Sequence, residues 1–145
     1  MPAPDSSAEK PPQIGVDADS GVYDVRAGAH HLSGNVRITR GSLEVLADEA
    51  HSFSSEGRIQ RIELYGNPTT WNDVMEDGSD VSGSSDQIVY DFNANIITMI
   101  GNAHIRNIQG EFSGPRLTYD LDTQNLVGDG GVRLIIEPEA AGTGG

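Results

Sequence analysis

Apolar and polar residues alternate along most of the chain with a period of two. Such alternation puts successive side chains on opposite faces of an extended strand, so each alternating segment predicts a strand with one buried and one solvated face. No window carries a sustained apolar stripe at helical spacing. The pattern therefore predicts an all-β fold. The expected inward positions are Val36/Ile38, Leu43/Val45/Ala47, Ile62/Leu64, Ile88/Tyr90/Phe92, Ala103/Ile105, Leu117/Tyr119/Leu121 and Val132/Leu134.

Clusters of turn-forming residues separate these segments. The clusters read "SSEG", "MEDGSD", "FNAN" and "LDTQN". Gly, Asn, Asp and Ser are the residues that tight turns favour, because they tolerate left-handed backbone or hydrogen-bond nearby amides. The sequence therefore predicts an antiparallel meander with short connections.

An internal repeat organises the meander. The sixteen residues "YDFNANIITMIGNAHI" from Tyr90 return in altered form from Tyr23 and from Tyr119. In each copy Tyr-Asp opens the unit, a polar stretch follows, and a glycine stands eleven residues after the tyrosine. Each copy predicts a hairpin whose two strands face the same side. The glycines, Gly34, Gly101 and Gly130, are expected to mark a bulge or bend.

A fourth, degenerate copy contains "RIELYGNPTTW", with Gly66 at the glycine position and Phe53 near the tyrosine position. Repeated hairpins of this kind are typical of a solenoid or jelly roll, in which neighbouring units complete one another's core.

The two ends of the chain differ from the repeats. Residues 1–13 are rich in Pro, Ser and charge, and residues 138–145 are rich in Gly and Ala. Neither end holds enough large apolar residues to offset the entropy of ordering, so both are predicted to be disordered tails. The sequence thus predicts one domain over residues 14–137, a size typical of a single core.

Charge and composition exclude several functions. The net charge is −13, with 22 acidic residues against nine basic ones, which disfavours nucleic-acid partners. The chain has no cysteine, so it has neither disulfides nor thiolate metal ligands. No apolar run approaches the roughly 20 residues of a membrane helix. A secretory signal is also absent from this chain, and we expect any such signal to have been removed.

The residues with catalytic potential do not form a recognisable site. His30 and His31 are adjacent, and neighbours on a strand point to opposite faces, so they are not expected to share a metal. The acidic segments "DADSG" and "MEDGSD" do not continue into a calcium-binding loop. We predict no enzyme activity, no metal and no cofactor. The aspartates that follow the repeated tyrosines are expected to bond turn amides; these are Asp24, Asp91 and Asp120.

The apolar face of the predicted sheet admits two arrangements. Either two faces close on each other as a dry core, or they stand apart and hold a hydrophobic guest. The alternation pattern is the same in both cases and leaves both open.

Four segments resemble, in order and spacing, the OstA-like family of lipopolysaccharide-transport proteins. They are "LSGNVRITRGSLEVLADEA", "YGNPTTW", "SSDQIVYDFNANIITMIGNAHI" and "GPRLTYDLDTQNLVGDGGVRL". The family motifs G-N-V, A-D, G-x-P and G-N-A fall at Gly34-Asn35-Val36, Ala47-Asp48, Gly66-Asn67-Pro68 and Gly101-Asn102-Ala103. The resemblance covers Ile14 to Glu137, and "IGVDAD" resembles the opening strand of the family.

The resemblance implies an open antiparallel β-jellyroll, a V-shaped stack of hairpins, without enzyme activity. It implies a periplasmic carrier that holds the lipid A acyl chains of lipopolysaccharide in an apolar groove and passes them from the inner to the outer membrane. Its implied partners are inner-membrane and outer-membrane transport proteins of similar fold. The residues expected to bind lipid are Ile14, Val16, Val36, Ile38, Val45, Leu64, Trp71, Ile88, Tyr90, Phe92, Ile97, Met99 and Tyr119.

The resemblance also bears on assembly and charge. The first strand, near residues 14–17, and the last, near 132–137, are expected to be free edges that join protomers head to tail by strand addition. Because the net charge opposes a phosphorylated head group, we expect the head group to stay outside the groove, with repulsion softened by rim arginines: Arg26, Arg37, Arg40 and Arg116.

Two other function classes remain. One is a scaffold with a closed dry core that functions only by strand-edge assembly. The other is a lectin-like or hydrolytic jelly roll acting on polysaccharide, which the sequence favours less because the aromatic residues share the buried positions.

Overall fold

The computed structural model describes residues 13–136. The predicted tails, except for Gln13, and the expected domain limit at Glu137 lie outside these residues. Within them every regular element is a β-strand, as the alternation predicted. No helix in this part of the chain is therefore long and apolar enough to cross a membrane.

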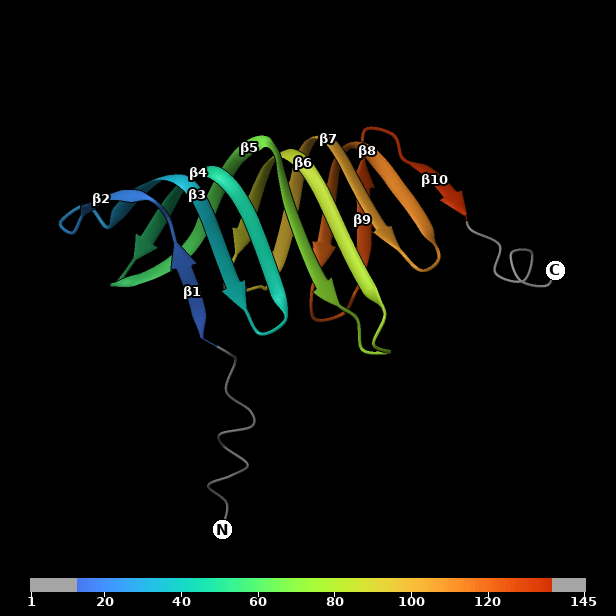
Figure 1. The fold of residues 1–145 in the computed structure, drawn as a ribbon, viewed down its shortest axis with the longest axis horizontal. Helices are drawn as coiled ribbons and strands as arrows, with labels where there is room; N and C mark the ends of the chain where they lie inside the picture. Colours follow the sequence, from blue (N-terminus) through green and yellow to red (C-terminus); the bar gives the residue numbers. More distant parts are fainter. Residues whose placement is uncertain (1–12, 137–145) are drawn as a thin grey trace, which may run out of the picture.

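Ten strands form a single antiparallel sheet (Figure 1). The main path runs β1-β3-β4-β5-β6-β7-β8-β10, with β2 also paired to β3 and β9 also paired to β8. Consecutive strands are neighbours from β3 to β8, which is the predicted meander. The strands are β1 (Ile14–Asp17), β2 (Ser20–Asp24), β3 (Ala29–Arg40), β4 (Leu43–Ser55), β5 (Arg58–Val74), β6 (Asp80–Asp91), β7 (Ile96–Asn107), β8 (Gly110–Asp120), β9 (Leu126–Asp129) and β10 (Arg133–Ile136).

The long strands bend over a common crest, so the sheet is folded into two walls (Figure 1). Register shifts interrupt the strand pairing at this crest, as bulges do when they bend a strand. The shifts fall between Ser33 and Val36, Leu46 and Glu49, Tyr65 and Thr69, Ser84 and Gln87, and Ile100 and Ala103.

Each wall has its own pair of edge strands. β1 pairs with the second half of β3, and β10 pairs with the first half of β8. We call the wall that contains β1 and β10 the first wall. β2 pairs with the first half of β3 and β9 with the second half of β8, and these halves belong to the second wall. The sequence predicted a free strand at each end but not that each end carries two.

Two of the repeated glycines make the bend possible. Gly34 and Gly101 have φ of +83° and +85°, and an added Cβ would lie 2.7 Å and 2.6 Å from a neighbouring aspartate oxygen. The asparagine that follows each glycine also has positive φ and donates a hydrogen bond to that aspartate. The predicted bulges at these two positions are therefore confirmed. The partner aspartates, Asp19 and Asp86, were not foreseen.

The repeated Tyr-Asp units form hairpins of the second wall, as predicted. The carboxylate of Asp24 accepts the amide of Ala27 at 3.0 Å. The Asp91 carboxylate accepts the amides of Asn93 and Ala94 at 3.0 Å, and Asp120 repeats the arrangement in the last hairpin. Each aspartate thus fixes a turn, since a carboxylate that accepts an amide two or three residues on stabilises the reversal.

Burial departs from the predicted pattern at both ends of the sheet. Val132 and Leu134 were expected to face inward but are 51% and 46% exposed, and Tyr23 is 63% exposed. Burial requires a covering neighbour on each side, and an edge strand has only one. The alternation is therefore the same at the edges and in the middle, whereas the burial is not.

Candidate functional site

The interior between the two walls is the candidate site. Inward side chains from both walls form one continuous apolar cluster along the length of the sheet. Ten of the residues predicted to bind lipid belong to it and are at most 4% exposed. Ile14 and Phe92 pack against the cluster, and Val16 is 40% exposed. The inward orientation of the ten is thus confirmed, whereas their contact with lipid stays a prediction. They are Val36, Ile38, Val45, Leu64, Trp71, Ile88, Tyr90, Ile97, Met99 and Tyr119.

Trp71 fills the middle of the interior and contacts side chains of the opposite wall. Trp71 lies in the first wall, and its indole N–H donates to Sδ of Met99 in the second wall at 3.2 Å. The ring of Trp71 also stacks on Tyr119, with centroids 5.4 Å apart. Gly83 makes room for the indole, because an added Cβ would lie 2.6 Å from Cε2 of Trp71. Side chains from the two walls therefore occupy the space that an acyl chain would take.

The side chain of Arg40 joins the rims of the two walls, on the open side of the V, through polar contacts. Arg40, the last residue of β3 in the first wall, donates to the Tyr90 hydroxyl at 3.1 Å, to the Phe92 carbonyl at 3.3 Å and to Asn95 Oδ1 at 3.2 Å. Tyr90 itself donates to Asn95 Oδ1 at 2.9 Å. We call these four residues the Arg40 clasp. Burial raises the pKa of the Tyr90 hydroxyl, and the guanidinium of Arg40 offsets this in part.

The sequence placed Arg40 at the rim only as a charge that softens repulsion. Its role as a contact between walls was missed, because its partners lie 50 to 55 residues away in the chain. No local pattern relates residues at that separation.

Toward the C-terminal end the interior opens into a cavity of about 330 Å3. The Tyr119 hydroxyl is buried near this cavity without a hydrogen-bond partner, and burial is the main cause of its raised pKa. Sequence reasoning marked Ile105 and Tyr119 as inward and missed the other apolar residues that line this cavity. The apolar lining consists of Met75, Ile105, Ile108, Phe112, Tyr119 and Leu126.

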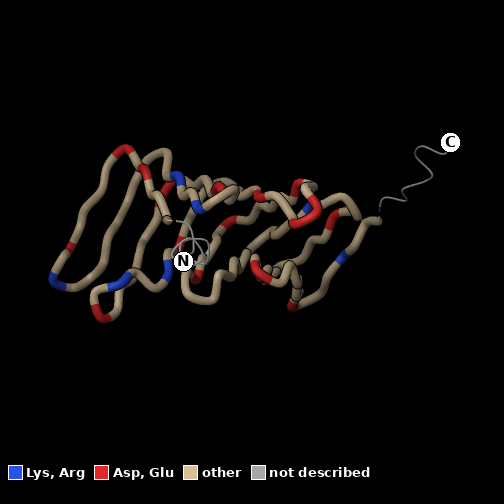
Figure 2. Tube along the Cα trace, turned by 90° about the horizontal axis from the view of Figure 1, so that it is seen from below, with Lys and Arg blue, Asp and Glu red and all other residues tan. Residues whose placement is uncertain are grey.

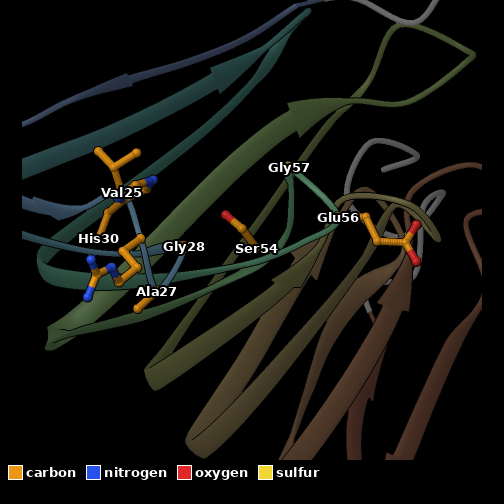
Figure 3. Close-up of a pocket in the computed structure, with 8 residues that line it drawn as sticks. Val25, Ala27, Gly28, His30, Ser54, Glu56 and Gly57 are labelled. Carbon is orange, nitrogen blue, oxygen red and sulfur yellow. The ribbon is translucent and has the colours of Figure 1, made fainter.

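A second hollow, of about 340 Å3, lies at the N-terminal end between the β2–β3 and β4–β5 turns (Figure 3). Ser54 donates its amide to the Gly28 carbonyl at 3.0 Å and holds the turns together. Nδ1 of His30 is buried here without a hydrogen-bond partner, while the side chain of Glu56 points away from the other labelled residues. Only Val25 and Ala27 line this hollow with apolar side chains. The C-terminal cavity has six apolar side chains beside its polar ones, which include Asp77 and Asn107, so it fits a hydrocarbon chain better.

Charge is distributed unevenly along the molecule. Figure 2, seen from the open side of the V, shows acidic residues along the whole length and basic residues mainly in the N-terminal half. Of the predicted rim arginines, Arg37 pairs with Glu44 and is half exposed, whereas Arg40 is part-buried in the clasp. The interior itself is lined by apolar groups.

The fold and the interior define an open antiparallel β-jellyroll with an apolar interior and, at both ends, edge strands that no other strand of residues 13–136 covers. The sequence profile of the family described as LptA/(LptD N-terminal domain) LPS transport protein matches residues 15–125. The chain belongs to this family, which confirms the resemblance to the OstA-like proteins.

Individual relatives agree with this assignment. The chain is 25% identical over 120 residues to the lipopolysaccharide export system protein LptA of Haemophilus influenzae, a match that covers 81% of this chain and 70% of that protein. It is 24% identical over 115 residues to the LptA of Escherichia coli K12, covering 78% of this chain but only 62% of that protein. The match thus leaves more than a third of the Escherichia coli protein uncovered.

A solved structure has the same fold. The crystal structure of LptH of Pseudomonas aeruginosa, described as the LptA-homologous periplasmic component of the lipopolysaccharide transport device, superposes with a TM-score of 0.81. The superposition covers 88% of this chain and 96% of LptH at 19% identity. At this identity the likeness establishes the open jellyroll fold and no more.

Proposed function

We propose that this chain is a periplasmic, non-enzymatic carrier that binds the acyl chains of lipopolysaccharide between its two walls and passes the lipid along an end-to-end assembly. The observation that carries the proposal is the continuous apolar cluster between the walls. Strand pairing holds each wall together and connects the two walls at the crest, whereas side chains alone fill the space between them. Membership of a lipopolysaccharide-transport family supports the lipid class. The periplasmic location follows the description of LptH.

The energetics of the lipid require such an interior. Burial of one methylene contributes about 0.8 kcal/mol, so a chain of about twelve carbons contributes on the order of 9 kcal/mol. A lipid with several chains therefore does not cross water unaided. The net charge of −13 repels phosphate groups, so the affinity comes from the apolar chains, and the head group stays outside the walls.

Binding requires the walls to part, because their side chains fill the interior. Parting exchanges contacts between side chains for contacts with lipid, which keeps apolar surface out of water in both states. The C-terminal cavity next to Tyr119 is the site where a chain inserts with least rearrangement, because space is already present there. The Arg40 clasp and the contact between Trp71 and Met99 are displaced as the lipid advances.

End-to-end assembly uses the edge strands. All four residues of β10 are exposed, and among the described strands β10 pairs with β8 alone. An exposed edge offers free backbone amides and carbonyls that a strand from another molecule can pair with. Because β10 and β1 edge the same wall at opposite ends, addition of β1 of one copy to β10 of the next prolongs that wall. Transport proteins of similar fold in the inner and outer membranes are the proposed partners at the ends of the row.

Site-specific photocrosslinking tests the lipid site. A benzophenone amino acid replaces Phe92 at the rim or Phe112 at the C-terminal cavity, and Val127 on the outer face of β9 serves as the control. Irradiation with lipopolysaccharide should link lipid to the first two variants and not to the third. Equal labelling at all three positions, or none at Phe92 and Phe112 in folded protein, would refute binding between the walls.

One observation favours the scaffold alternative: the middle of the interior is closed, with Ile38, Leu64 and Met99 fully buried. A protein whose walls never part would assemble through its edges without binding lipid. Titration of lipopolysaccharide with Trp71 emission as the signal separates the two functions. Trp71 is the only tryptophan and lies where the walls meet, so micromolar binding with a shift in its emission supports the carrier.

A further inference from the structure

His31 and His51 form a pair on the outer face of the second wall. The register places them directly opposite each other on β3 and β4, next to the pair formed by Leu32 and Ala50. Leu32 and Ala50 are buried in the interior, so the alternation of strand side chains directs the two imidazoles outward. Their rings are stacked, with centroids 4.3 Å apart and planes 5° from parallel.

Glu49 completes the group. It stands two residues before His51 on β4 and therefore on the same face. One ligand atom of Glu49, His31 and His51 each lies within 4.8 Å of the other two. Tyr65, opposite Glu49 on β5, lies edge to face with His51, with ring centroids 5.9 Å apart, and its hydroxyl donates to Glu63 at 3.0 Å.

One nitrogen of the His31 imidazole lacks a hydrogen-bond partner. Its Nε2 is buried and makes no hydrogen bond, although His31 as a whole is half-buried. A buried polar atom without a partner is costly, and it is retained where something outside the chain can satisfy it. A metal ion is such a partner, because it accepts the nitrogen lone pair.

We propose that His31, His51 and Glu49 bind a divalent first-row transition cation of the Zn2+ type. Two imidazoles and one carboxylate are a ligand set that Zn2+ accepts, with water in the fourth position. Imidazole nitrogen disfavours Ca2+ and Mg2+, which prefer oxygen ligands. Ligands at about 2.0 to 2.2 Å require the rings to rotate out of the stack. Both rings lie half-buried on the outer face, and Glu49 is exposed.

The site is separate from the interior. A bound ion cross-links β3 and β4 beside β2, the edge strand of the second wall, and leaves the lipid-facing side of both strands free. Sequence reasoning considered His30 with His31, which point to opposite faces. The pair that meets is His31 with His51, because register rather than sequence adjacency brings side chains together.

Calorimetric titration of ZnCl2 into the full chain without a histidine tag tests the proposal. We expect one ion per chain with a dissociation constant in the micromolar range or below. His31→Ala and His51→Ala each remove a ligand and should weaken binding by about 100-fold or more, because loss of a group that only orients a metal ligand already costs about 10- to 100-fold. Glu49→Gln keeps one oxygen and should weaken binding by about 10-fold. His104→Ala is the matched control, since His104 lies in the first wall beside Glu111 and should leave the affinity unchanged.

A second readout is the melting temperature. A ligand that binds only the folded state raises it, so Zn2+ should raise the melting temperature of the parent and of His104→Ala but not of His51→Ala. Circular dichroism of each variant without metal shows that it is folded. Failure of the parent to bind one Zn2+ tighter than about 100 µM, or binding that survives loss of both His31 and His51, would overturn the proposal.

Discussion

The guanidinium of Arg40 donates a hydrogen bond of 3.1 Å to the hydroxyl of Tyr90, 50 residues away in the chain. The two residues belong to opposite walls, and the same guanidinium also contacts the turn after β6 through Phe92 and Asn95. This polar contact connects the two rims, which would have to part for a lipid to insert under the proposed function. We therefore expect this single side chain to contribute both to stability and to the barrier against the proposed opening.

Replacement of Arg40 by alanine should ease opening. Loss of the charged donor should lower the free energy of unfolding by about 1 to 2 kcal/mol. It should also speed the uptake of a fluorescent fatty-acyl probe, measured by stopped-flow fluorescence. Arg37→Ala is the control, because Arg37 is half exposed and pairs with Glu44 within the first wall. Unchanged uptake in Arg40→Ala would show that the clasp does not limit opening.

Tyr90 and Tyr119 should respond in opposite ways to loss of the hydroxyl. The Tyr90 hydroxyl bonds Arg40 and Asn95, so Tyr90→Phe should lower the free energy of unfolding by about 1 to 2 kcal/mol. The Tyr119 hydroxyl is buried without a partner, so Tyr119→Phe should raise that free energy by about 1 kcal/mol. Urea denaturation of the two variants measures both changes. If both variants lose the same free energy of unfolding, the Tyr119 hydroxyl has a hydrogen-bond partner in solution.

Local patterns predicted much of this fold. The alternation around Ile97 and Met99 gives their strand and their inward orientation, and the repeated glycine coincides with a bulge in two of the three copies, at Gly34 and Gly101. Gly130 lies just after β9 and not in a bulge. These features depend on residues a few positions apart, where backbone conformation and side-chain direction are coupled.

Contacts that depend on tertiary register were not predicted. The meeting of His31 with His51 follows from the pairing of β3 with β4, whose register shifts between Ser33 and Val36. The contact of Arg40 with Tyr90 follows from the folding of one wall toward the other. The alternation pattern predicts the face of the sheet on which a residue lies. It does not predict which residue lies opposite on the neighbouring strand or wall, so neither contact follows from it.

Alkaline pH should destabilise the chain through its buried phenols. Burial raises the pKa of Tyr90 and Tyr119, so the folded chain holds these protons more tightly than the unfolded chain does. This contribution to stability is fully present below the unfolded value of about 10 and is lost as the pH rises through the folded pKa.

The free energy of unfolding should therefore be steady up to about pH 9 and fall above about pH 10. The double variant Tyr90→Phe/Tyr119→Phe should show a shallower fall, with a remainder from Tyr65, whose pKa is also raised by burial and by Glu63. Tyr23→Phe is the control, because Tyr23 is exposed. Identical slopes in the parent and the double variant would contradict the assignment.

Gly83 should be intolerant of any side chain. An added methyl group would overlap the indole of Trp71, so Gly83→Ala should lower the free energy of unfolding by about 1 to 3 kcal/mol. It should also shift Trp71 emission to longer wavelength, because the displaced ring meets water. Ser82→Ala, at the exposed neighbouring position, should do neither. A Gly83→Ala variant with the parent's emission and stability would show that the indole does not lie over Gly83 in solution.

The C-terminal edge should control growth of the assembly. An added Cβ on Gly110 would overlap the carbonyl oxygen of Ile135, which places that carbonyl against β8. Backbone groups of an antiparallel edge strand alternate between the neighbouring strand and solvent, so the amides of Leu134 and Ile136 face outward. Proline at either position removes an outward donor and should block strand addition while the pairing with β8 persists. Ile135→Ala, which keeps every amide, is the control.

Static light scattering over a concentration series measures the outcome of this change. The parent and Ile135→Ala should gain mass with concentration, because addition of β1 of one copy to β10 of the next is a heterologous contact that does not close on itself. Leu134→Pro and Ile136→Pro should stay monomeric and still bind lipopolysaccharide, since the interior is untouched. If the proline variants gain mass with concentration as the parent does, the contact between protomers does not use the outer edge of β10. A parent that stays monomeric at high concentration would refute self-association through these edges and leave strand addition to a membrane-bound partner as the remaining use of β10.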